Sequence, residues 1–255
     1  MPKLTADDKF LDLSDYGRPL ASFFVNQVKT TRLTAIHITF LFGIAGLIAI
    51  YFMLNNYYFL AGIFLIVKSI LDAADGELAR VKQQPSYVGR YLDSVFDIIL
   101  NFFIFWTIAF VTKTEYLLAF SAFFCVQFQG TLYNYYYVIL RNNSVGGDAT
   151  SQIFENKIPN ALVGESQWAV NLLFGLYSVC YGIFDRIIYF LDKKASKSID
   201  FPNWFMTFVS IYGLGFQLLI IAIMLAFNLI AYIIPFFIFY TLLVFILIII
   251  RKFFK

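Results

Sequence analysis

The chain has 255 residues, of which 60% are hydrophobic and 14% are charged, and its mean hydropathy is +0.75. Soluble domains contain about 45–50% apolar and about 25% charged residues, so this composition excludes an ordinary soluble protein and indicates an integral membrane protein. The net charge of +3 is small, and no basic and aromatic pattern points to a nucleic-acid partner.

The apolar segments are joined by tight turns, which predicts helices packed as hairpins. A membrane-spanning helix needs about 20 apolar residues. Residues 1–32 alternate acids with Phe, Leu and Tyr, and we expect them to lie at the membrane interface. The remaining pattern predicts an all-α, polytopic membrane protein with six transmembrane helices, at residues 33–54, 57–71, 91–111, 116–140, 204–227 and 229–250.

Residues 141–203 form an insertion between the fourth and fifth predicted spans, and residues 142–151 within it have the composition of a loop. Residues 169–191 are apolar enough to cross a membrane. Their polar residues recur every seven positions and would form one stripe along a helix: Asn171, Ser178, Asp185 and Asp192. We therefore favour an interfacial helix, with a seventh span as the alternative. Residues 1–255 are interpreted as a single domain, and the sequence assigns the insertion no role.

The basic residues predict the orientation in the membrane. With six spans, both termini lie on one side, and of the 19 Lys and Arg residues only Lys113 falls on the other side. Cytoplasmic loops carry the excess of Lys and Arg. We therefore expect a multi-pass protein with both termini in the cytoplasm, in the inner membrane if the source is bacterial.

The most informative stretch reads D-x2-D-G-x2-A-R-x8-G-x3-D-x3-D. Its eight fixed positions are Asp72, Asp75, Gly76, Ala79, Arg80, Gly89, Asp93 and Asp97. Acids inside a membrane are costly and usually functional. Residues three or four apart share a helix face, so two neighbouring helices would each present a pair of carboxylates. Such an oxygen site suits Mg²⁺ or Mn²⁺ and could hold two ions around a phosphate chain.

The other fixed positions suit a phosphate ligand. Gly76, Ala79 and Gly89 remove side-chain bulk within one turn of the acids, which leaves room for a flat ring or a close backbone. Arg80 offers a rigid fork of donors that matches phosphate oxygens. A purely structural role for the acids, in ion pairs with nearby Lys and Arg, does not account for the small residues.

This motif resembles the signature of the CDP-alcohol phosphatidyltransferase family of integral membrane enzymes. The resemblance implies transfer of a substituted phosphate from a CDP-linked donor to an alcohol, with release of CMP. It further implies that Asp72, Asp75 and Asp93 bind metal, and that Asp97 is the general base while contributing to the metal site. Gly76, Ala79 and Gly89 would line the nucleotide pocket with Arg80 nearby, and the protein would be a homodimer.

One family feature is altered here. The family usually enters the first span through a T-P-N-x-L-T-like stretch, whereas residues 29–34 read KTTRLT. Leu33 and Thr34 fit this pattern, but Thr30 and Thr31 replace the Pro and the Asn. The polar residues of the fourth predicted span could line an acceptor pocket or could hydrogen-bond other helices: Gln127, Gln129, Tyr133, Asn134, Tyr135, Tyr136, Tyr137 and Arg141.

Three functions are consistent with these features. The first is phosphatidyl transfer from a lipid donor, CDP-diacylglycerol, to an alcohol such as glycerol phosphate, serine or inositol phosphate in phospholipid synthesis. The second is transfer from CDP-choline or CDP-ethanolamine to diacylglycerol, which the shared motif does not separate from the first. The third is a cation-coupled transporter, which would require acids spread across the membrane. Because all four acids lie near one face, we favour the enzyme, with its active site open to the cytoplasm.

Overall fold

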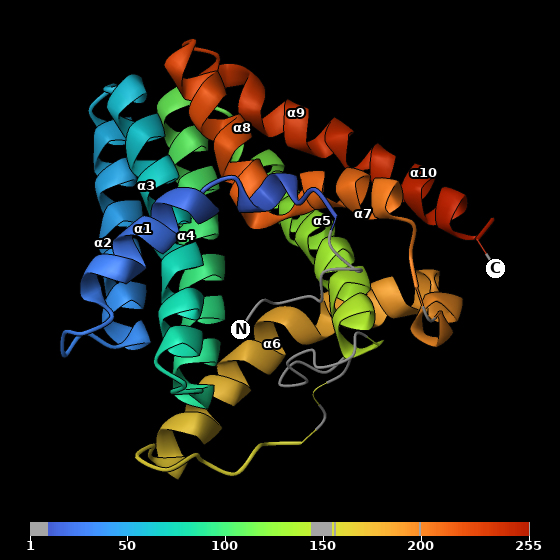
Figure 1. Cartoon of the computed structure of the whole chain (residues 1–255). Coiled ribbons are helices and arrows are strands. Elements are labelled where there is room, and N and C mark those ends of the chain that lie inside the picture. Colours follow the sequence, from blue (N-terminus) through green and yellow to red (C-terminus); the bar gives the residue numbers. More distant parts are fainter. Residues whose placement is uncertain (1–9, 144–154, 156, 199, 255) are drawn as a thin grey trace.

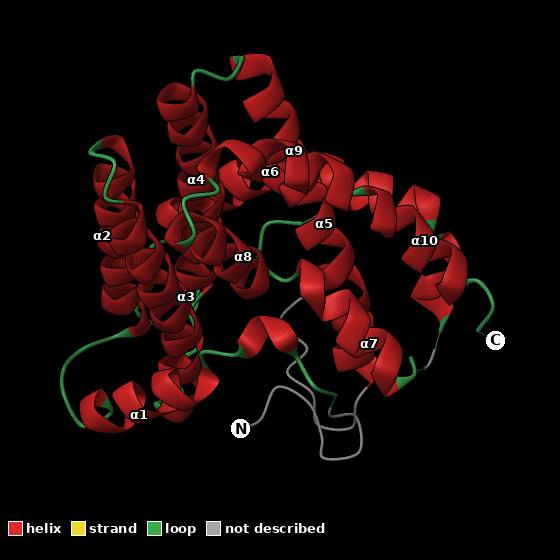
Figure 2. Ribbon diagram, turned by 90° about the horizontal axis from the view of Figure 1, so that it is seen from above, coloured by secondary structure: helices red, strands yellow, loops and turns green. Residues whose placement is uncertain are grey.

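The computed structural model describes residues 10–143, 155, 157–198 and 200–254, and all regular elements within these ranges are helices (Figures 1 and 2). In chain order they are η1 (Leu13–Asp15), α1 (Arg18–Val28), α2 (Ala35–Leu54), α3 (Tyr58–Val81), α4 (Tyr87–Thr112), α5 (Tyr116–Asn143), α6 (Gln167–Leu191), η2 (Lys193–Lys197), α7 (Asn203–Val209), η3 (Ser210–Tyr212), α8 (Leu214–Ala226), α9 (Ile230–Tyr240) and α10 (Leu242–Arg251). The all-α prediction is confirmed for these ranges. The predicted interfacial residues 1–9 and most of the predicted loop at 142–151 lie outside them.

The predicted hairpins form at tight turns. Asn56 follows α2 with φ 62°, and Lys113 follows α4 with φ 56°. This left-handed conformation at the residue after a helix satisfies late carbonyl groups and reverses the chain. As a result α3 returns alongside α2, and α5 leaves the far end of α4 (Figure 1).

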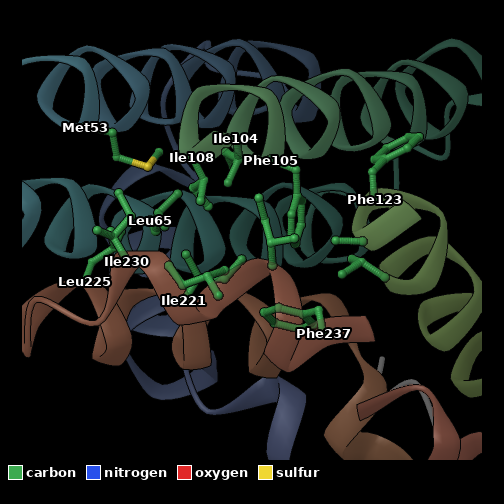
Figure 3. Packing of buried hydrophobic residues seen from close by; sticks show 14 of the residues in the cluster. Met53, Leu65, Ile104, Phe105, Ile108, Phe123, Ile221, Leu225, Ile230 and Phe237 are labelled. Atoms are coloured by element: carbon green, nitrogen blue, oxygen red, sulfur yellow. The ribbon is translucent and has the colours of Figure 1, made fainter. Parts of the chain in front are cut away.

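The main hydrophobic core lies between helices that are distant in sequence (Figure 3). Leu65 of α3, Ile104 and Phe105 of α4, and Ile221 of α8 are all buried in it. The approach of α3 to α8 depends on Gly62, since a Cβ there would lie 2.8 Å from the carbonyl oxygen of Ala222. Both α3 and α4 also pack on α2, which lets their motif side chains face each other.

Four described helices are long and apolar enough to cross a membrane by length and composition: Ala35–Leu54, Tyr87–Thr112, Gln167–Leu191 and Ile230–Arg251. The pair Asn203–Tyr212 and Leu214–Ala226 would make a fifth span if its bend of 54° lies within one crossing. The predicted second span is part of α3, which carries Lys68, Asp72 and Asp75 within its apolar stretch, and this helix does not meet the same criteria. Neither does α5, which holds the predicted fourth span.

Helix α6, whose placement the sequence left open, runs obliquely across the bundle (Figure 1). Phe174, in its first half, packs edge-on against Tyr91 near the start of α4. Asp192, directly after its last turn, accepts a hydrogen bond from Tyr136 of α5 and pairs with Arg251, the last residue of α10. Thus α6 connects the start of one helix to the ends of two others, unlike the helices of the hairpins.

Helix α8 begins against the N-terminal turn η1, and Gly215 makes this contact possible. A Cβ on Gly215 would lie 2.0 Å from the carbonyl oxygen of Ser14. We expect Gly215→Ala to destabilise the protein by about 1–3 kcal/mol through overpacking, seen as a lower unfolding temperature in detergent. Gly175→Ala in α6 is the matched control, because its Cβ would meet nothing within 4 Å and helical Ala is favoured over Gly by about 1 kcal/mol. Equal effects of the two substitutions would contradict this account of the contact.

Candidate active site

Three of the four motif acids come together where α3 lies beside α4. Asp72 and Asp75 lie on α3 and Asp93 lies on α4, and each offers a carboxylate oxygen within 4.8 Å of the others. Asp75 is buried, whereas Asp72 and Asp93 are half-buried. The i,i+3 spacing predicted a shared face for the first pair, and α4 supplies the third acid. Three of the four motif acids therefore lie together, and Asp97 is not among them.

The surroundings of the cluster match a cation. Oδ1 of Asp93 is buried and has no hydrogen-bond partner among the described residues. A buried acceptor without a partner costs about 1–3 kcal/mol, which a bound cation would offset. Three carboxylates provide a donor set of hard oxygen atoms, the type that Mg²⁺ and Mn²⁺ prefer. The residues of the cluster therefore fit a divalent ion.

Thr39 of α2 supports the cluster and was not singled out from the sequence. Its Oγ1 donates a hydrogen bond of 2.7 Å to Oδ2 of Asp75, and it also lies 3.1 Å from the carbonyl oxygen of Ala35. The hydrogen bond orients the Asp75 carboxylate from a third helix. A hydroxyl in the otherwise apolar first span was the only signal available, and such residues often bond to their own helix.

The fourth motif acid, Asp97, is held by a lysine. Nζ of Lys68 lies 2.6 Å from Oδ1 of Asp97, and the Lys68 side chain is fully buried. The same ammonium group stands 4.8 Å from the centroid of the Phe42 ring. Asp97 remains close enough to Asp72, Asp75 and Asp93 to interact with them electrostatically. In the sequence Lys68 stands four residues before Asp72, where the two could pair on one helix face, whereas the structure pairs Lys68 with Asp97.

The small motif residues have packing roles that the structure defines. Gly89 is buried in the first turn of α4, where a Cβ would lie 3.1 Å from Oγ of Ser86 and 3.5 Å from Ile36. Its N–H group donates to the Ser86 hydroxyl, which caps the helix. A Cβ on Gly76 would lie 3.4 Å from a guanidinium nitrogen of Arg80. The Arg80 side chain therefore folds back over Gly76, and Ala79 beside it is half-buried.

The entry to α2 is tied to the end of α3. Nζ of Lys82 donates hydrogen bonds of 2.7 Å and 2.6 Å to the carbonyl oxygens of Thr31 and Leu33. These residues belong to the stretch in which Thr replaces the Pro and Asn of the expected pattern. Lys82 thus fixes this entry directly beside the turn that leads into α4.

The described part of the insertion docks onto the start of α4. Oε1 of Glu165 accepts hydrogen bonds from Oγ of Ser86, at 2.6 Å, and from the N–H group of Val88, at 2.9 Å. Glu155 pairs with Arg90 and accepts a hydrogen bond of 2.7 Å from the Tyr91 hydroxyl. An anionic side chain at a helix N-terminus is favourable. The insertion therefore stabilises the helix turn that carries Gly89.

Glu165 makes a pH-dependent contribution to stability. Burial would raise the pKa of Glu165, but hydrogen bonds from Ser86, Val88 and Leu162 outweigh it and hold the pKa below its usual value. A carboxyl with a depressed pKa stabilises the fold above its unfolded-state pKa, near 4.5, and this stabilisation disappears as the pH falls through the folded-state pKa. We expect Glu165→Gln to lower the unfolding temperature at pH 7, with a smaller difference from the unchanged protein as the pH falls below about 4.5. A Glu165 effect independent of pH would contradict this contribution.

The polar residues of α5 bond mostly to other helices. Gln129 donates to the carbonyl oxygen of Phe237 and to Thr241, and Tyr133 donates to Asp12. The hydroxyls of Tyr135 and Tyr136 bond to the backbone and the side chain of Asp192. Of the two interpretations open from the sequence, these contacts favour hydrogen bonding between helices for these four residues.

Comparison with known proteins assigns the part of the chain that holds the motif to a known family. A family model described as CDP-alcohol phosphatidyltransferase matches residues 32–183, which include all eight motif positions. The chain is also similar to three proteins named "Bifunctional IPC transferase and DIPP synthase". The protein from Archaeoglobus fulgidus is 35% identical over 83 residues, 32% of this chain and 16% of that protein. That from Aquifex aeolicus is 34% identical over 83 residues, 32% and 18% of the two chains, and that from Thermococcus kodakarensis is 37% identical over 78 residues, 31% and 17%. The matched segment spans less than a fifth of the length of these relatives.

Proposed function

Because this chain belongs to the CDP-alcohol phosphatidyltransferase family, we propose that it transfers the phosphatidyl group of CDP-diacylglycerol to an alcohol and releases CMP, as a step of phospholipid synthesis. The observation that carries this proposal is the cluster of Asp72, Asp75 and Asp93 at the meeting of α3 and α4. The names of the relatives include a transferase and a synthase, which supports an enzymatic role.

The motif acids divide into two roles in this proposal. Asp72, Asp75 and Asp93 would hold Mg²⁺ or Mn²⁺, and Asp97 would serve as the general base. When bound, the ion would neutralise the donor diphosphate and stabilise the CMP that leaves. The buried, partnerless oxygen of Asp93 supports the first role. The position of Asp97 beside the cluster, with its own lysine, supports the second.

The reaction forms one bond and breaks one. The acceptor hydroxyl oxygen forms a new bond to the phosphorus that carries the diacylglycerol group. The bond from that phosphorus to the oxygen of CMP breaks, and CMP departs with the electron pair. The hydroxyl proton would pass to the carboxylate of Asp97, whose Oδ1 accepts a hydrogen bond of 2.6 Å from Nζ of Lys68. A positioned base of this kind typically contributes 10²–10⁴-fold to the rate.

Gly76, Ala79, Arg80 and Gly89 would form the nucleotide pocket. The guanidinium of Arg80 lies beside Gly76, the residue that follows Asp75. From there its N–H groups could reach a phosphate oxygen of the CDP-linked substrate. A Cβ on Gly89 would lie 3.1 Å from Oγ of Ser86, so a larger residue there would press on the cap of α4. Substitution at Gly89 should therefore disturb the α4 start as well as any nucleotide.

The proposed setting is the cytoplasmic face of a membrane. Both termini and the active site would lie on the cytoplasmic side, as the distribution of Lys and Arg predicts. Helices α1 and α6 would lie near that surface, which the oblique course of α6 supports (Figure 1). The lipid donor would enter sideways from the bilayer, the alcohol would arrive from the cytoplasm, and the enzyme would act as a homodimer.

The test is a comparison of donors. Purified protein in detergent and lipid micelles would receive Mn²⁺ or Mg²⁺ and either CDP-diacylglycerol with glycerol phosphate, serine or inositol phosphate, or CDP-choline or CDP-ethanolamine with diacylglycerol. We expect CMP release with CDP-diacylglycerol and one of the alcohols. Release only in the second arm would transfer the assignment to an amino-alcohol phosphotransferase. The absence of CMP release with both sets of substrates, in a folded preparation, would refute the proposal.

A further inference from the structure

Lys68 is a fully buried cation beside the motif acids, in direct contact with Asp97. It lies on α3, one turn before Asp72, and its Nζ donates to Asp97 on α4 at 2.6 Å. Its charge also acts on Asp72 and Asp93. Among the described Lys and Arg residues only Arg251 is comparably buried, and it pairs with Asp192 outside the motif, so the ammonium group of Lys68 is the one buried basic group at the motif acids.

The position of the Lys68 ammonium is defined from three helices. Asp97 of α4 accepts its hydrogen bond, and Phe42 of α2 presents its ring at 4.8 Å from Nζ. Phe42 is itself fully buried. An aromatic face toward an ammonium group is an attractive arrangement, strongest where water is excluded. Two independent contacts therefore hold a positive charge at Asp97.

A divalent ion at Asp97 would have to share that carboxylate with this ammonium group. Lys68 already occupies one oxygen of Asp97 at hydrogen-bond distance. Two cations on one buried carboxylate repel each other, because charges interact strongly where water is excluded. The cluster of Asp72, Asp75 and Asp93 feels the same charge only from further away, since among the described residues no basic side chain bonds to its oxygens.

We propose that Lys68 is the permanent cation at Asp97, so that the protein without substrate binds one divalent ion, at Asp72, Asp75 and Asp93. Lys68 is then a positioning residue, which keeps Asp97 outside the metal's ligand set and free to face the acceptor. This inference rests on the metal site of the proposed function. It differs from the two-ion site that the spacing of the motif allowed.

The experiment counts Mn²⁺ ions by electron paramagnetic resonance during titration of the purified, metal-free protein. We expect one ion per chain in the unchanged protein and in Lys68→Arg, which keeps the charge. Lys68→Met should bind two, since Asp97 then lacks its cation. The double variant Lys68→Met/Asp97→Asn should return to one, which assigns the second ion to Asp97. A purely structural ion pair would leave the count unchanged in all four proteins.

The competing outcomes separate this inference from the proposed function. Two ions of comparable affinity in the unchanged protein, or one ion in a folded Lys68→Met variant, would overturn the role of Lys68. If Lys68→Met does not fold, Asp97→Asn decides the matter: we expect it to keep one ion with unchanged affinity, and a fall from two to one would overturn the proposal. No bound Mn²⁺ in any variant would refute the metal site itself, whereas CMP release is measured separately on the same preparation.

Discussion

Replacement of Asp97 by Asn should reduce CMP release by at least 100-fold. The amide keeps the size of the side chain but cannot take the proton of the attacking hydroxyl, and a positioned general base contributes 10²–10⁴-fold. Initial rates with saturating CDP-diacylglycerol and acceptor measure the effect. Asp185→Asn, which changes an acid on α6 outside the motif, should retain full activity.

Loss of folding must be separated from loss of chemistry in the Asp97 variant. Asn at this position leaves the buried Lys68 without its anionic partner, and breaking a buried ion pair from one side costs about 3–5 kcal/mol. The double variant Lys68→Met/Asp97→Asn removes both charges and should recover much of the lost unfolding temperature. It should nevertheless remain inactive. An active double variant would exclude Asp97 as the base.

The second large effect is expected at the metal cluster. Asp93→Asn should abolish tight Mn²⁺ binding and CMP release together, because Asp93 is the only α4 residue among the three clustered acids and its Oδ1 has no hydrogen-bond partner in the described part of the chain. Binding would be measured by titration with Mn²⁺, followed by electron paramagnetic resonance.

Thr39→Val should have a smaller effect on Mn²⁺ binding than Asp93→Asn. It removes the hydroxyl that orients Asp75 and keeps all three carboxylates. Loss of a hydrogen bond to a metal ligand typically lowers metal affinity by about 10–100-fold, so binding should weaken without disappearing. A Thr39→Val protein as defective as Asp93→Asn, or an Asp93→Asn protein with normal affinity, would contradict the proposed ligand set.

Much of the fold followed from the sequence because its physical signals are local. Runs of apolar residues gave the helices α2, α4 and α9–α10, and tight turns at Asn56 and Lys113 gave the hairpins. Helix α3 was harder to assign from hydropathy, since its apolar stretch ends in Lys68, Asp72 and Asp75, yet it continues to Val81. Beyond the apolar run, Ala74 and Leu78 pack against residues of α1 and α2, and this packing supports the extension of the helix.

The part of the candidate site that depends on residue spacing within the motif could be predicted from the sequence. The i,i+3 pair Asp72 and Asp75 and the separation to Asp93 were enough to place three acids together. Lys68 with Asp97 and Thr39 with Asp75 are contacts between different helices. Such contacts depend on helix rotation and packing, which no local pattern encodes.

The docking of the insertion onto the start of α4 could not be predicted from the sequence either. Glu165 lies 79 residues from Ser86 in the sequence, and its carboxylate accepts a hydrogen bond from the Ser86 hydroxyl. Neither residue belongs to the recognisable motif. Their meeting follows from the course of α6 back across the bundle, which the sequence left open between a surface helix and a span.

The most direct test of the central account is the metal dependence of CMP release. Protein treated with a chelator and returned to lipid micelles would receive CDP-diacylglycerol and its acceptor, first without metal and then with rising Mn²⁺. We predict no release at first, and then activity that rises in step with Mn²⁺ occupancy of the Asp72, Asp75 and Asp93 cluster. Full CMP release in the chelated protein, or activity unaffected by Asp93→Asn, would contradict the account.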